Sequence, residues 1–411
     1  MRTFTFNYRK TLLTVTFLVF FIGLANGQIK RTTTDTSKVL LNMDAVYNRP
    51  FLTSDKMPVA LGGYLEANSI YSIVDGVTEG LSFQARRMTI FMSASISKRI
   101  KFLSEMEFED GTKEIGIEFA AMDITFNPLL NLRGGIVMNP IGGFNQNHDG
   151  PKWEFVERPT MGVNLLPATW SNVGFGIFGK THKKNWVLGY EAYLTNGFDN
   201  SIINNTENKT YLPSAKGNPN RFEESSNGKP LLSGKIAIKN RKIGEIGISY
   251  MGGIYNQFEK DGVALDNKRR LDVFAIDFNT KISRTGTQFI GEVTTIIVDV
   301  SPTYTQQFGQ HQRGFFLDVI QPIKRGEIMD WEKASLNLSL RVDYVDWNVG
   351  EFKETKTNIG DELFALTPAL SFRPSSQTVL RLNYRYQWQK DIINNPAAKT
   401  ANWYFGLSTY F

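Results

Sequence analysis

The chain carries few residues suited to acid–base, nucleophilic or metal chemistry. It has 3 histidines and no cysteine among 411 residues, which excludes disulfides, thiolate zinc sites and cysteine nucleophiles. His148 and Asp149 are of types that ligate zinc, but Asp149, Gly150 and Pro151 are also common turn residues. No second histidine lies near them in the sequence, so we predict no metal site and no cofactor.

A hydrolytic site is not indicated either. An esterase or phospholipase barrel needs a serine or another nucleophile beside a positioned histidine. His182 falls in a short predicted turn and His311 in a loop, where Tyr304, Gln306 and Gln310 are its polar neighbours in the sequence. These residues form no recognisable catalytic constellation, and we predict that the protein is not an enzyme.

Charged residues at alternate positions are the more informative pattern. Glu105, Glu107 and Glu109 recur in LSEMEFED, and Arg381 and Arg385 alternate with leucine and aromatic residues in VLRLNYRYQW. Side chains alternate between the two faces of a β-strand, so both segments predict strands with one charged face and one apolar face. Because isolated buried charges are costly, the charged face must border water and the apolar face a nonpolar environment.

The first residues predict export from the cytoplasm. MRTFTFNYRK has basic residues and no acidic one, and the apolar run TLLTVTFLVFFIGLANG follows it. This is the layout of a secretory signal peptide, with Ala25 and Gly27 at the small-residue positions before cleavage. The alternative, a transmembrane anchor, needs about 20 apolar residues, and this run is shorter and interrupted by polar residues. We predict a signal peptide over residues 1–27 and a mature chain that begins at Gln28.

Removal of that segment changes the charge balance. Residues 1–27 contain three of the 46 Lys and Arg and none of the 40 Asp and Glu, so the mature chain has a net charge of 43 minus 40, or +3. No basic face of the kind that binds nucleic acid is therefore predicted. After residue 27 no stretch is apolar enough to cross a bilayer as a helix, which leaves a soluble exported protein or a membrane β-barrel.

The chain from Val59 onward divides into segments of period-two character, which is typical of barrel strands. Residues 28–57 are polar and irregular, and they predict a periplasmic N-terminal extension ahead of a barrel over residues 58–411. We predict sixteen strands, near 59–72, 82–96, 101–109, 116–126, 130–139, 172–180, 185–196, 231–240, 243–256, 270–283, 287–299, 312–323, 334–347, 363–373, 377–389 and 401–411.

The predicted connections alternate between long and short. The first, VDGVTEGL, is followed by SKRI, and residues 140–171 are followed by THKK. The connection KRGEIMDWEK, at 324–333, falls among the short ones. Long connections at one rim and short turns at the other are typical of an outer-membrane barrel, whereas a soluble sandwich would not be expected to keep this alternation.

The chain finishes on ANWYFGLSTYF, which places Trp403, Phe405, Leu407 and Phe411 on one face of a strand. A strand of ten residues tilted near 45° rises roughly 25 Å, the height of the apolar band of an outer membrane. We predict that this strand closes an all-β transmembrane antiparallel barrel of about 16 strands. Lipid would cover the apolar face, and aromatic residues near strand ends would lie in the interfacial girdles.

The inner face of such a barrel would be lined by charged residues. Sixteen strands enclose a lumen too wide for side chains to fill. The candidate pore-lining residues are Glu105, Glu107, Glu109, Glu118, Glu191, Arg341, Arg373, Arg381 and Arg385. The glutamates and the arginines fall on different parts of the wall, so they could create a transverse field that orients dipolar solutes and filters ions. The alternative is that they face the lumen without a role in selectivity.

The third long connection, residues 140–171, is apolar and aromatic in places, which is unusual for a solvated outer loop. We predict that this loop folds into the barrel and sets the constriction. Trp153, Glu154, Glu157 and Arg158 are the candidate constriction residues. The alternative is a loop that braces the wall without narrowing the pore.

Four segments have a porin-like character: LGGYLEANSIY, LSFQARRMTIFMSASISKRIKFLSEMEFEDG, LNLRGGIVMNPIGGFNQNHDGPKWEFVERP and the terminal strand. In these segments the chain resembles the phosphate-selective porin O/P family, over most of the mature chain in architecture and over residues 58–180 in motif detail. The resemblance implies a sixteen-stranded, usually trimeric, outer-membrane channel whose third loop enters the pore. Anion-selective members line the pore with Arg and Lys, whereas this chain has Glu105, Glu107, Glu109 and Glu118 at inward positions.

We therefore predict an outer-membrane porin for the passive diffusion of small hydrophilic solutes or ions, surrounded by outer-membrane lipid and assembled as a homotrimer. The second hypothesis is a barrel that does not conduct: an adhesin, an assembly partner or a surface scaffold whose long loops bind another molecule. The second hypothesis predicts a plugged lumen, and the loop over 140–171 could supply the plug.

Overall fold

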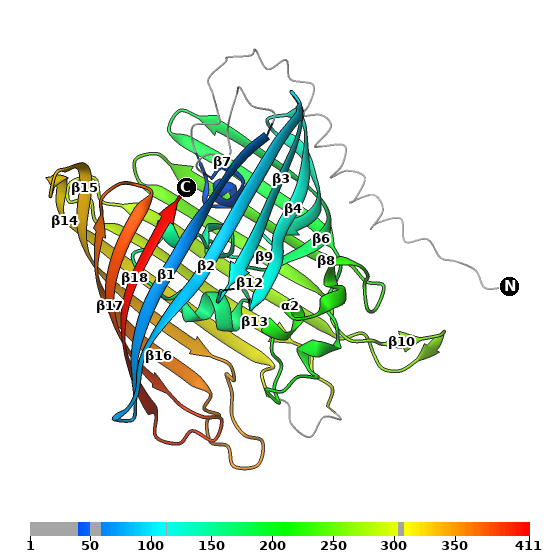
Figure 1. Cartoon of the computed structure of the whole chain (residues 1–411). Helices are drawn as coiled ribbons and strands as arrows, with labels where there is room; N and C mark the ends of the chain where they lie inside the picture. Colours follow the sequence, from blue (N-terminus) through cyan, green and yellow to red (C-terminus); the bar gives the residue numbers. More distant parts are fainter. Residues whose placement is uncertain (1–39, 50–58, 112, 303–307) are drawn as a thin grey trace. The chain divides into compact units, whose positions relative to one another are not determined.

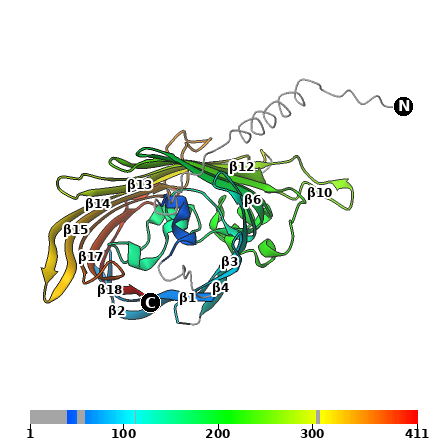
Figure 2. The same cartoon turned by 90° about the horizontal axis from the view of Figure 1, so that it is seen from above.

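The computed structural model describes residues 40–49, 59–111, 113–302 and 308–411. Sixteen antiparallel strands close into one barrel, in which β1 (Val59–Val74) pairs with β18 (Ala398–Tyr410) at the seam. The side view shows the strands tilted along the wall (Figure 1), and the view from above shows a wall that surrounds helical segments and loops (Figure 2). The predicted fold class is therefore confirmed.

All sixteen predicted strands are present. The remaining strands of the barrel are β2 (Val77–Ser97), β3 (Ile100–Glu109), β4 (Glu114–Asn127), β5 (Leu130–Met138), β6 (Ser171–Lys183), β7 (Trp186–Thr195), β8 (Leu231–Asn240), β9 (Gly244–Ile254), β12 (Arg270–Lys281), β13 (Gln288–Val298), β14 (His311–Ile328), β15 (Trp331–Asp346), β16 (Glu362–Arg373) and β17 (Thr378–Gln389). Strands adjacent in the chain are neighbours in the sheet, and β9 pairs with β12 because β10 (Glu259–Lys260) and β11 (Val263–Ala264) form a separate hairpin. Figure 1 shows this hairpin projecting away from the barrel.

Two predicted connections are wrong in length. The first connection narrows to Asp75 and Gly76, whose φ angles are 47° and 87°. A two-residue hairpin turn with positive φ at both central positions suits Asp-Gly, so β1 and β2 pair up to the turn itself. The predicted connection over 324–333 likewise narrows to Met329 and Asp330, because β14 and β15 continue past the polar residues that resembled a loop.

Short helices occupy the long connections and the segment before the first strand. They are η2 (Asn42–Tyr47), η3 (Asn145–Asn147), η4 (Gly150–Lys152), the π-helical turn η5 (Met161–Leu165), η6 (Asn200–Ile202), α2 (Pro213–Lys216) and η7 (Pro219–Phe222). None of the helices in the described ranges is long and apolar enough to cross a bilayer.

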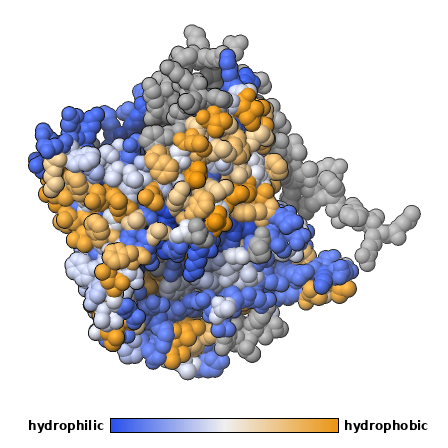
Figure 3. Space-filling view, viewed as in Figure 1, coloured by the Kyte–Doolittle hydropathy of each residue, from blue (hydrophilic) through white to orange (hydrophobic). Residues whose placement is uncertain are grey.

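The outer face of the wall is apolar, as the alternation predicts. On β17 the side chain of Leu382 is 45% exposed while that of its neighbour Arg381 is 1% exposed. On the side of the barrel that carries β1 and β2, hydrophobic side chains gather in a broad region with a more hydrophilic surface below it (Figure 3). Aromatic rings also meet on the outer face, including Trp403, which lies 4.8 Å from Tyr384 between ring centroids. This surface suits a hydrocarbon environment.

The interior contains an apolar core that the alternation does not predict. It joins the connection between β5 and β6, called L3 here (residues 139–170), to the connection between β7 and β8 and to the inner wall from β8 to β16. Its larger members are Phe144, Trp153, Met161, Leu165, Trp170, Phe198, Ile202, Leu212, Met251, Leu271, Val273, Ile296, Phe316 and Val345. A sixteen-stranded wall alone encloses a lumen too wide for its own side chains to fill, and here these loops fill part of that lumen by packing against the wall.

The last strand closes the barrel, as predicted. Gly63 of β1 and the terminal Phe411 exchange two backbone hydrogen bonds, each of 3.0 Å between nitrogen and oxygen. A Cβ atom at Gly63 would lie 2.6 Å from Cζ of Phe411. The glycine therefore leaves room for the terminal aromatic ring beside the seam.

The part of the chain before β1 is described only over residues 40–49. The predicted signal peptide over 1–27 lies outside the described residues, as do 28–39 and 50–57 of the predicted periplasmic extension. Residues 40–49 lie inside the barrel, where η2 is drawn in dark blue (Figure 2). The extension remains a prediction for the residues that are not described.

Candidate functional site

L3 is folded into the barrel, as predicted, and its base is held by one asparagine. The Asn145 amide donates to the carbonyl oxygens of Asn139 and Trp170, at 2.8 and 3.0 Å, and its oxygen accepts from the Trp170 backbone nitrogen at 2.8 Å. Asn139 and Trp170 are the two ends of the loop. Asn145 therefore closes L3 at its base and directs the intervening residues across the lumen.

The first bend of L3 is bound to the inner faces of β8 and β13. Lys235 donates to the Gly142 carbonyl oxygen at 2.7 Å, and Glu292 accepts from the backbone nitrogens of Gly143 and Phe144 at 2.8 and 3.0 Å. Gly142 has a φ of +65°, and a Cβ atom there would collide with the Glu292 carboxylate. Glycine is therefore required at this close approach.

Residues 154–160 of L3 follow the inner faces of β15, β16 and β17. The predicted wall arginines donate to this stretch: Arg381 to the Phe155 carbonyl oxygen, Arg341 to the Glu157 carbonyl oxygen and Arg385 to the Thr160 hydroxyl, each at 2.7 Å. Arg373 donates to the Glu154 carboxylate, also at 2.7 Å. All four arginines therefore point inward and bind L3, and their predicted role as pore-lining residues stays a prediction.

The same arginines are paired with carboxylates. Arg341 forms a two-pronged contact with Asp318, with nitrogen–oxygen distances of 2.6 and 2.7 Å. Arg381 donates to Glu66 at 2.7 Å and Arg385 to Asp343 at 2.9 Å. These three carboxylates were not among the predicted site residues. Since β14 pairs Asp318 directly with Arg341 of β15, strand register could have identified this pair.

The predicted acidic residues also have partners in the interior. Glu107 and Glu109 form ion pairs with the Arg87 guanidinium, at nitrogen–oxygen distances of 3.2 and 2.7 Å. The Glu191 carboxylate accepts from Gln146 of L3 at 2.9 Å. Glu118 occupies a bulge between β3 and β4 and is hydrogen-bonded to Thr169 of L3.

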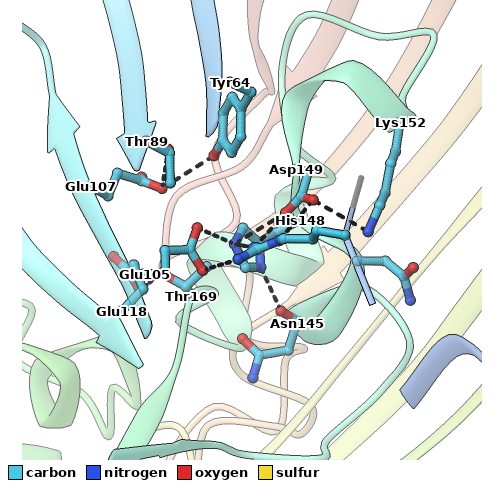
Figure 4. A network of polar contacts seen from close by, with 12 residues as sticks. Tyr64, Thr89, Glu105, Glu107, Glu118, Asn145, His148, Asp149, Lys152 and Thr169 are labelled. Carbon is cyan, nitrogen blue, oxygen red and sulfur yellow. Dashed lines mark hydrogen bonds and ion pairs between the residues drawn. The ribbon is translucent and has the colours of Figure 1, made fainter. Parts of the chain in front are cut away.

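Arg49 is the central residue of the interior that the sequence did not reveal. Its guanidinium donates to Glu105 of β3 at 2.7 Å and to both oxygens of Asp149 of L3 at 2.6 and 3.0 Å. It also lies 3.9 Å from the ring centroid of Phe91 and is only 2% exposed. Figure 4 shows Glu105, His148 and Asp149 converging in this network.

Opposite charges within this network offset the cost of burying its ionised groups. Burial alone would raise the pKa of Asp149, but the positive charges of Arg49 and Lys152 hold it well below its ordinary value. Lys152 lies 3.4 Å from Asp149 (Figure 4), and burial lowers the pKa of this lysine. Asp149 is therefore ionised in the folded protein at neutral pH.

The rest of the 40–49 segment binds the wall from β6 to β9. Lys180 of β6 donates to Asp44 and the Asn42 backbone nitrogen donates to Glu245 of β9, both at 2.7 Å. The side chains of Leu41 and Met43 pack against the wall residues Val187 and Ala237. The segment is thus attached to β3, to L3 and to the wall from β6 to β9.

Within the described part of the chain, one group has metal-site geometry: Glu105, Glu107 and His148, whose potential ligand atoms lie within 4.8 Å of one another. His148 Nδ1 lies 2.8 Å from the Asn145 carbonyl oxygen, so this nitrogen is assigned as the donor. His148 Nε2 then accepts from Arg49 Nη2 at 3.1 Å. The guanidinium is thus hydrogen-bonded to two of these three residues, Glu105 and His148. The prediction that the chain binds no metal stays a prediction.

The four candidate constriction residues fall into two groups. Trp153 and Glu154 are buried, and Glu154 is bonded to Ser371 and Arg373 of β16, so both hold L3 against the wall. Glu157 and Arg158 are half-buried. The Arg158 guanidinium lies 3.8 Å from Glu107, whereas within the described residues no hydrogen bond or ion pair of the Glu157 carboxylate is found. Whether the second pair lines a constriction remains a proposal.

The sequence matches no protein-family profile. A protein of Aquifex aeolicus (strain VF5), described as uncharacterized, is 26% identical over 370 residues, which cover 85% of this chain and 80% of that protein.

Several solved structures are similar in fold. The anion-selective porin from Comamonas acidovorans has a TM-score of 0.53 and 9% identity, covering 86% of this chain and 99% of its own. The outer membrane channel DcaP of Acinetobacter baumannii has a TM-score of 0.52 and 11% identity, with 86% and 97% covered. OprB of Pseudomonas putida has a TM-score of 0.52 and 9% identity, with 86% and 94% covered. At these identities the likeness concerns the fold alone: the chain forms a closed sixteen-stranded barrel similar to those of these outer-membrane channels.

Proposed function

We propose that the protein is an outer-membrane porin through which small hydrophilic solutes or ions diffuse passively. The observation that carries the proposal is a closed sixteen-stranded barrel with an apolar outer face, an inner face that bears charged residues, and a long third loop folded inside it. A wall of this size leaves room for water beside the loop.

The permeation path is proposed to run between L3 and the wall formed by β3 and β4. Glu157 and, to a lesser degree, Arg158 are partly exposed on L3, and Glu109 and Glu118 lie on the facing strands. Each of these side chains either is in contact with solvent or lies beside a residue that is. They are the residues best placed to meet a passing ion.

We propose weak ion selectivity and no dedicated phosphate site. The arginines of the wall are already paired with carboxylates, so they would add little net field across the lumen. A phosphate-selective function, as in the porin O/P family that the sequence resembles, would require unpaired cationic groups along the path. A homotrimer and a cleaved signal peptide over residues 1–27 belong to the same proposal.

Reconstitution tests the proposal directly. The purified full-length mature protein is placed in planar bilayers and in liposomes loaded with sugars of graded size. Stepwise ohmic conductance and release of the smaller sugars are expected. Folded protein that inserts but neither conducts nor releases any sugar would overturn the proposal.

A second candidate is a barrel that does not conduct and acts as a surface scaffold, adhesin or assembly partner. The observation in its favour is that the segments inside the lumen are bound to many strands of the wall. L3 contacts β3, β7, β13 and β15 to β17. Residues 40–49 contact β3, β6 and β9. If the wild-type protein does not conduct and a variant that lacks residues 40–49 does, the result would favour a plugged barrel.

A further inference from the structure

A polar groove of about 440 Å³ lies in the connection between β7 and β8, called L4 here (residues 196–230). Residues of η6, α2 and η7 form its sides, and Gln257 of the next long connection closes it. Figure 1 shows α2 at the rim from which the β10–β11 hairpin projects. Sites for small molecules have volumes of about 300–1,000 Å³. A water needs about 10–15 Å³, so the groove has room for on the order of thirty non-hydrogen atoms.

The groove is held in shape by its own hydrogen bonds. The Asp199 carboxylate accepts from the Asn218 side-chain amide. The Asn200 side-chain oxygen accepts from the Gln257 backbone nitrogen at 2.9 Å, which joins L4 to the next long connection. Directly before Asp199, Phe198 is buried in the apolar core that includes residues of L3. The groove is therefore preformed on a part of L4 that is packed against the barrel interior.

Three side chains of the groove keep their hydrogen-bonding capacity. The amides of Asn220 and Gln257 form no side-chain hydrogen bond within the described residues, and the Glu224 carboxylate forms neither a hydrogen bond nor an ion pair there. Asn220 and Glu224 are exposed and Gln257 is half-buried, so a ligand can reach them from solvent. An amide both donates and accepts, whereas a carboxylate only accepts. The groove thus offers donors and acceptors side by side.

The lining disfavours two other classes of ligand. Its described residues are three asparagines, three serines, a glutamine, a glycine and two acidic residues, Asp199 and Glu224. An anion would meet two carboxylates and no cation among them. A ligand with an apolar side chain would find no aromatic or branched aliphatic residue among them, so it would bury little apolar area. A ligand with several hydroxyl groups fits, because each hydroxyl both donates and accepts.

We propose that this groove binds a saccharide of one or two rings. The amides of Gln257 and Asn220 would hydrogen-bond to neighbouring hydroxyl groups of the sugar, and Glu224 would accept from a further hydroxyl. In the proposed porin, L4 lies at the outer rim, so the groove would hold sugars at the channel entrance. The inference rests on the proposed function only for this physiological meaning.

The test is direct binding to the full-length mature protein, which does not depend on transport. The protein is solubilised in lauryldimethylamine oxide, because glucoside and maltoside detergents carry sugars that would compete. Saturation-transfer NMR and calorimetry are used with glucose, galactose, maltose and lactose, and with glucuronate as the anionic control. At least one of the four neutral sugars is expected to bind, and to bind more tightly than glucuronate.

Free sugars and cell-surface glycans share the same hydroxyl chemistry. Maltohexaose distinguishes these two sources. An affinity well above that of maltose would assign the groove to a surface glycan that continues beyond it. An affinity equal to that of maltose would assign it to free sugars.

Two variants with a matched control test the location of the site. A Cβ atom at Gly217 would come no closer than 3.4 Å to the Ser214 carbonyl oxygen, so Gly217→Phe can be accommodated and its ring would occupy the groove. It should weaken sugar binding more than about tenfold, since several hydrogen bonds would be lost. Gln257→Ala removes one amide and should weaken binding about two- to tenfold. Asn204→Ala, at an exposed amide of L4 that does not line the groove, should leave the affinity unchanged.

A second pair of variants tests the charge of the lining. Glu224→Gln should reduce the preference for neutral sugars over glucuronate, because it removes one of the two carboxylates. Glu207→Gln removes an exposed carboxylate of L4 outside the groove and should not change this preference. All of these side chains except that of Gln257 are exposed, so the variants are expected to fold.

The outcomes separate this inference from the proposed function. Conducting protein that binds none of the four sugars would overturn the saccharide site and leave the porin proposal standing. Binding that persists unchanged in Gly217→Phe and Gln257→Ala, or a preference for glucuronate, would also overturn it. Protein that binds a sugar in this groove but does not conduct would overturn passive diffusion alone.

Discussion

The guanidinium of Arg49 and the carboxylate of Asp149 are joined by two hydrogen bonds, although the residues stand 100 positions apart in the chain. Asp149 belongs to the loop folded into the barrel, and Arg49 to the segment before the first strand. The contact also includes Glu105 of β3, so it joins three separate parts of the chain at one buried point. L3 and the N-terminal segment therefore stabilise each other inside the lumen.

Replacing Arg49 with alanine should break the buried contact that joins the N-terminal segment, L3 and β3. The change would leave Glu105 and Asp149 buried without their main cation, and breaking a buried pair in this way costs about 3–5 kcal/mol. We expect a lower midpoint in urea and a higher single-channel conductance, because residues 40–49 would no longer be held at β3. Arg270→Ala is the matched control, since Arg270 is 54% exposed at the barrel rim and pairs with Asp272 there. Equal effects of the two substitutions would show that Arg49 holds nothing in place.

The same pair predicts resistance to acid. Asp149 has a depressed pKa in the folded protein, so its contribution to stability is present above the ordinary aspartate pKa of about 3.9 and is lost only as the pH falls through the lower folded value. The difference in unfolding free energy between wild type and Asp149→Asn should therefore stay constant from pH 7 to about pH 4. It should shrink only below that range. Urea titrations of both proteins across these pH values measure it, and a difference that already falls between pH 6 and 5 would contradict the assignment.

The barrel could be predicted from the sequence because each strand separates two media. Successive side chains of a strand point to opposite faces of the wall, so the apolar Leu380 and Leu382 point outward and Arg381 points inward among charged groups. Bounds were missed where residues typical of loops continue a strand, as at Thr78, Glu79 and Gly80 of β2, directly after the turn at Asp75 and Gly76. There the strand pairing extends to the turn and overrides the local composition.

The interior could be predicted only in part. The aromatic residues of L3 indicated that the loop folds inward, and the inward positions of Arg341 and Arg381 followed from alternation. Their neutralisation did not, because it depends on partners placed by the barrel register and by the path of the loop. Arg49 carries no signal at all: it stands in a polar stretch without periodicity, and its role appears only when the fold brings Glu105 and Asp149 beside it.

Gly63 should tolerate no side chain at the seam. An alanine Cβ there would collide with the Thr89 carbonyl oxygen and with the ring of Phe411. Overpacking of this kind costs about 1–3 kcal/mol, and here it acts on the strand pair that closes the barrel. We expect Gly63→Ala to lower the yield of folded, heat-modifiable barrel and its urea midpoint.

Gly116 on β4 provides the matched control for this substitution. A Cβ atom at Gly116 would meet nothing within 4 Å. Gly116→Ala should therefore change stability by less than about 0.5 kcal/mol, or raise it slightly by restricting the unfolded chain. If the two alanine variants folded equally well, the close approach of Gly63 to Phe411 would have no part in closure.

Glu154 and Glu157 are three positions apart on L3 and should separate anchoring from selectivity. Glu154 is bonded to Arg373 and Ser371, so Glu154→Gln should lower the urea midpoint and leave the reversal potential in a salt gradient nearly unchanged. Glu157 is half-exposed, and Glu157→Gln should shift the permeability ratio toward anions without loss of stability. A unit charge about 4 Å from an ion in water contributes about 1 kcal/mol, so the ratio should change by up to about fivefold. High salt should weaken this shift, because mobile ions screen exposed charges. A Glu157→Gln channel with unchanged reversal potential at low salt would place the path away from this side of the loop.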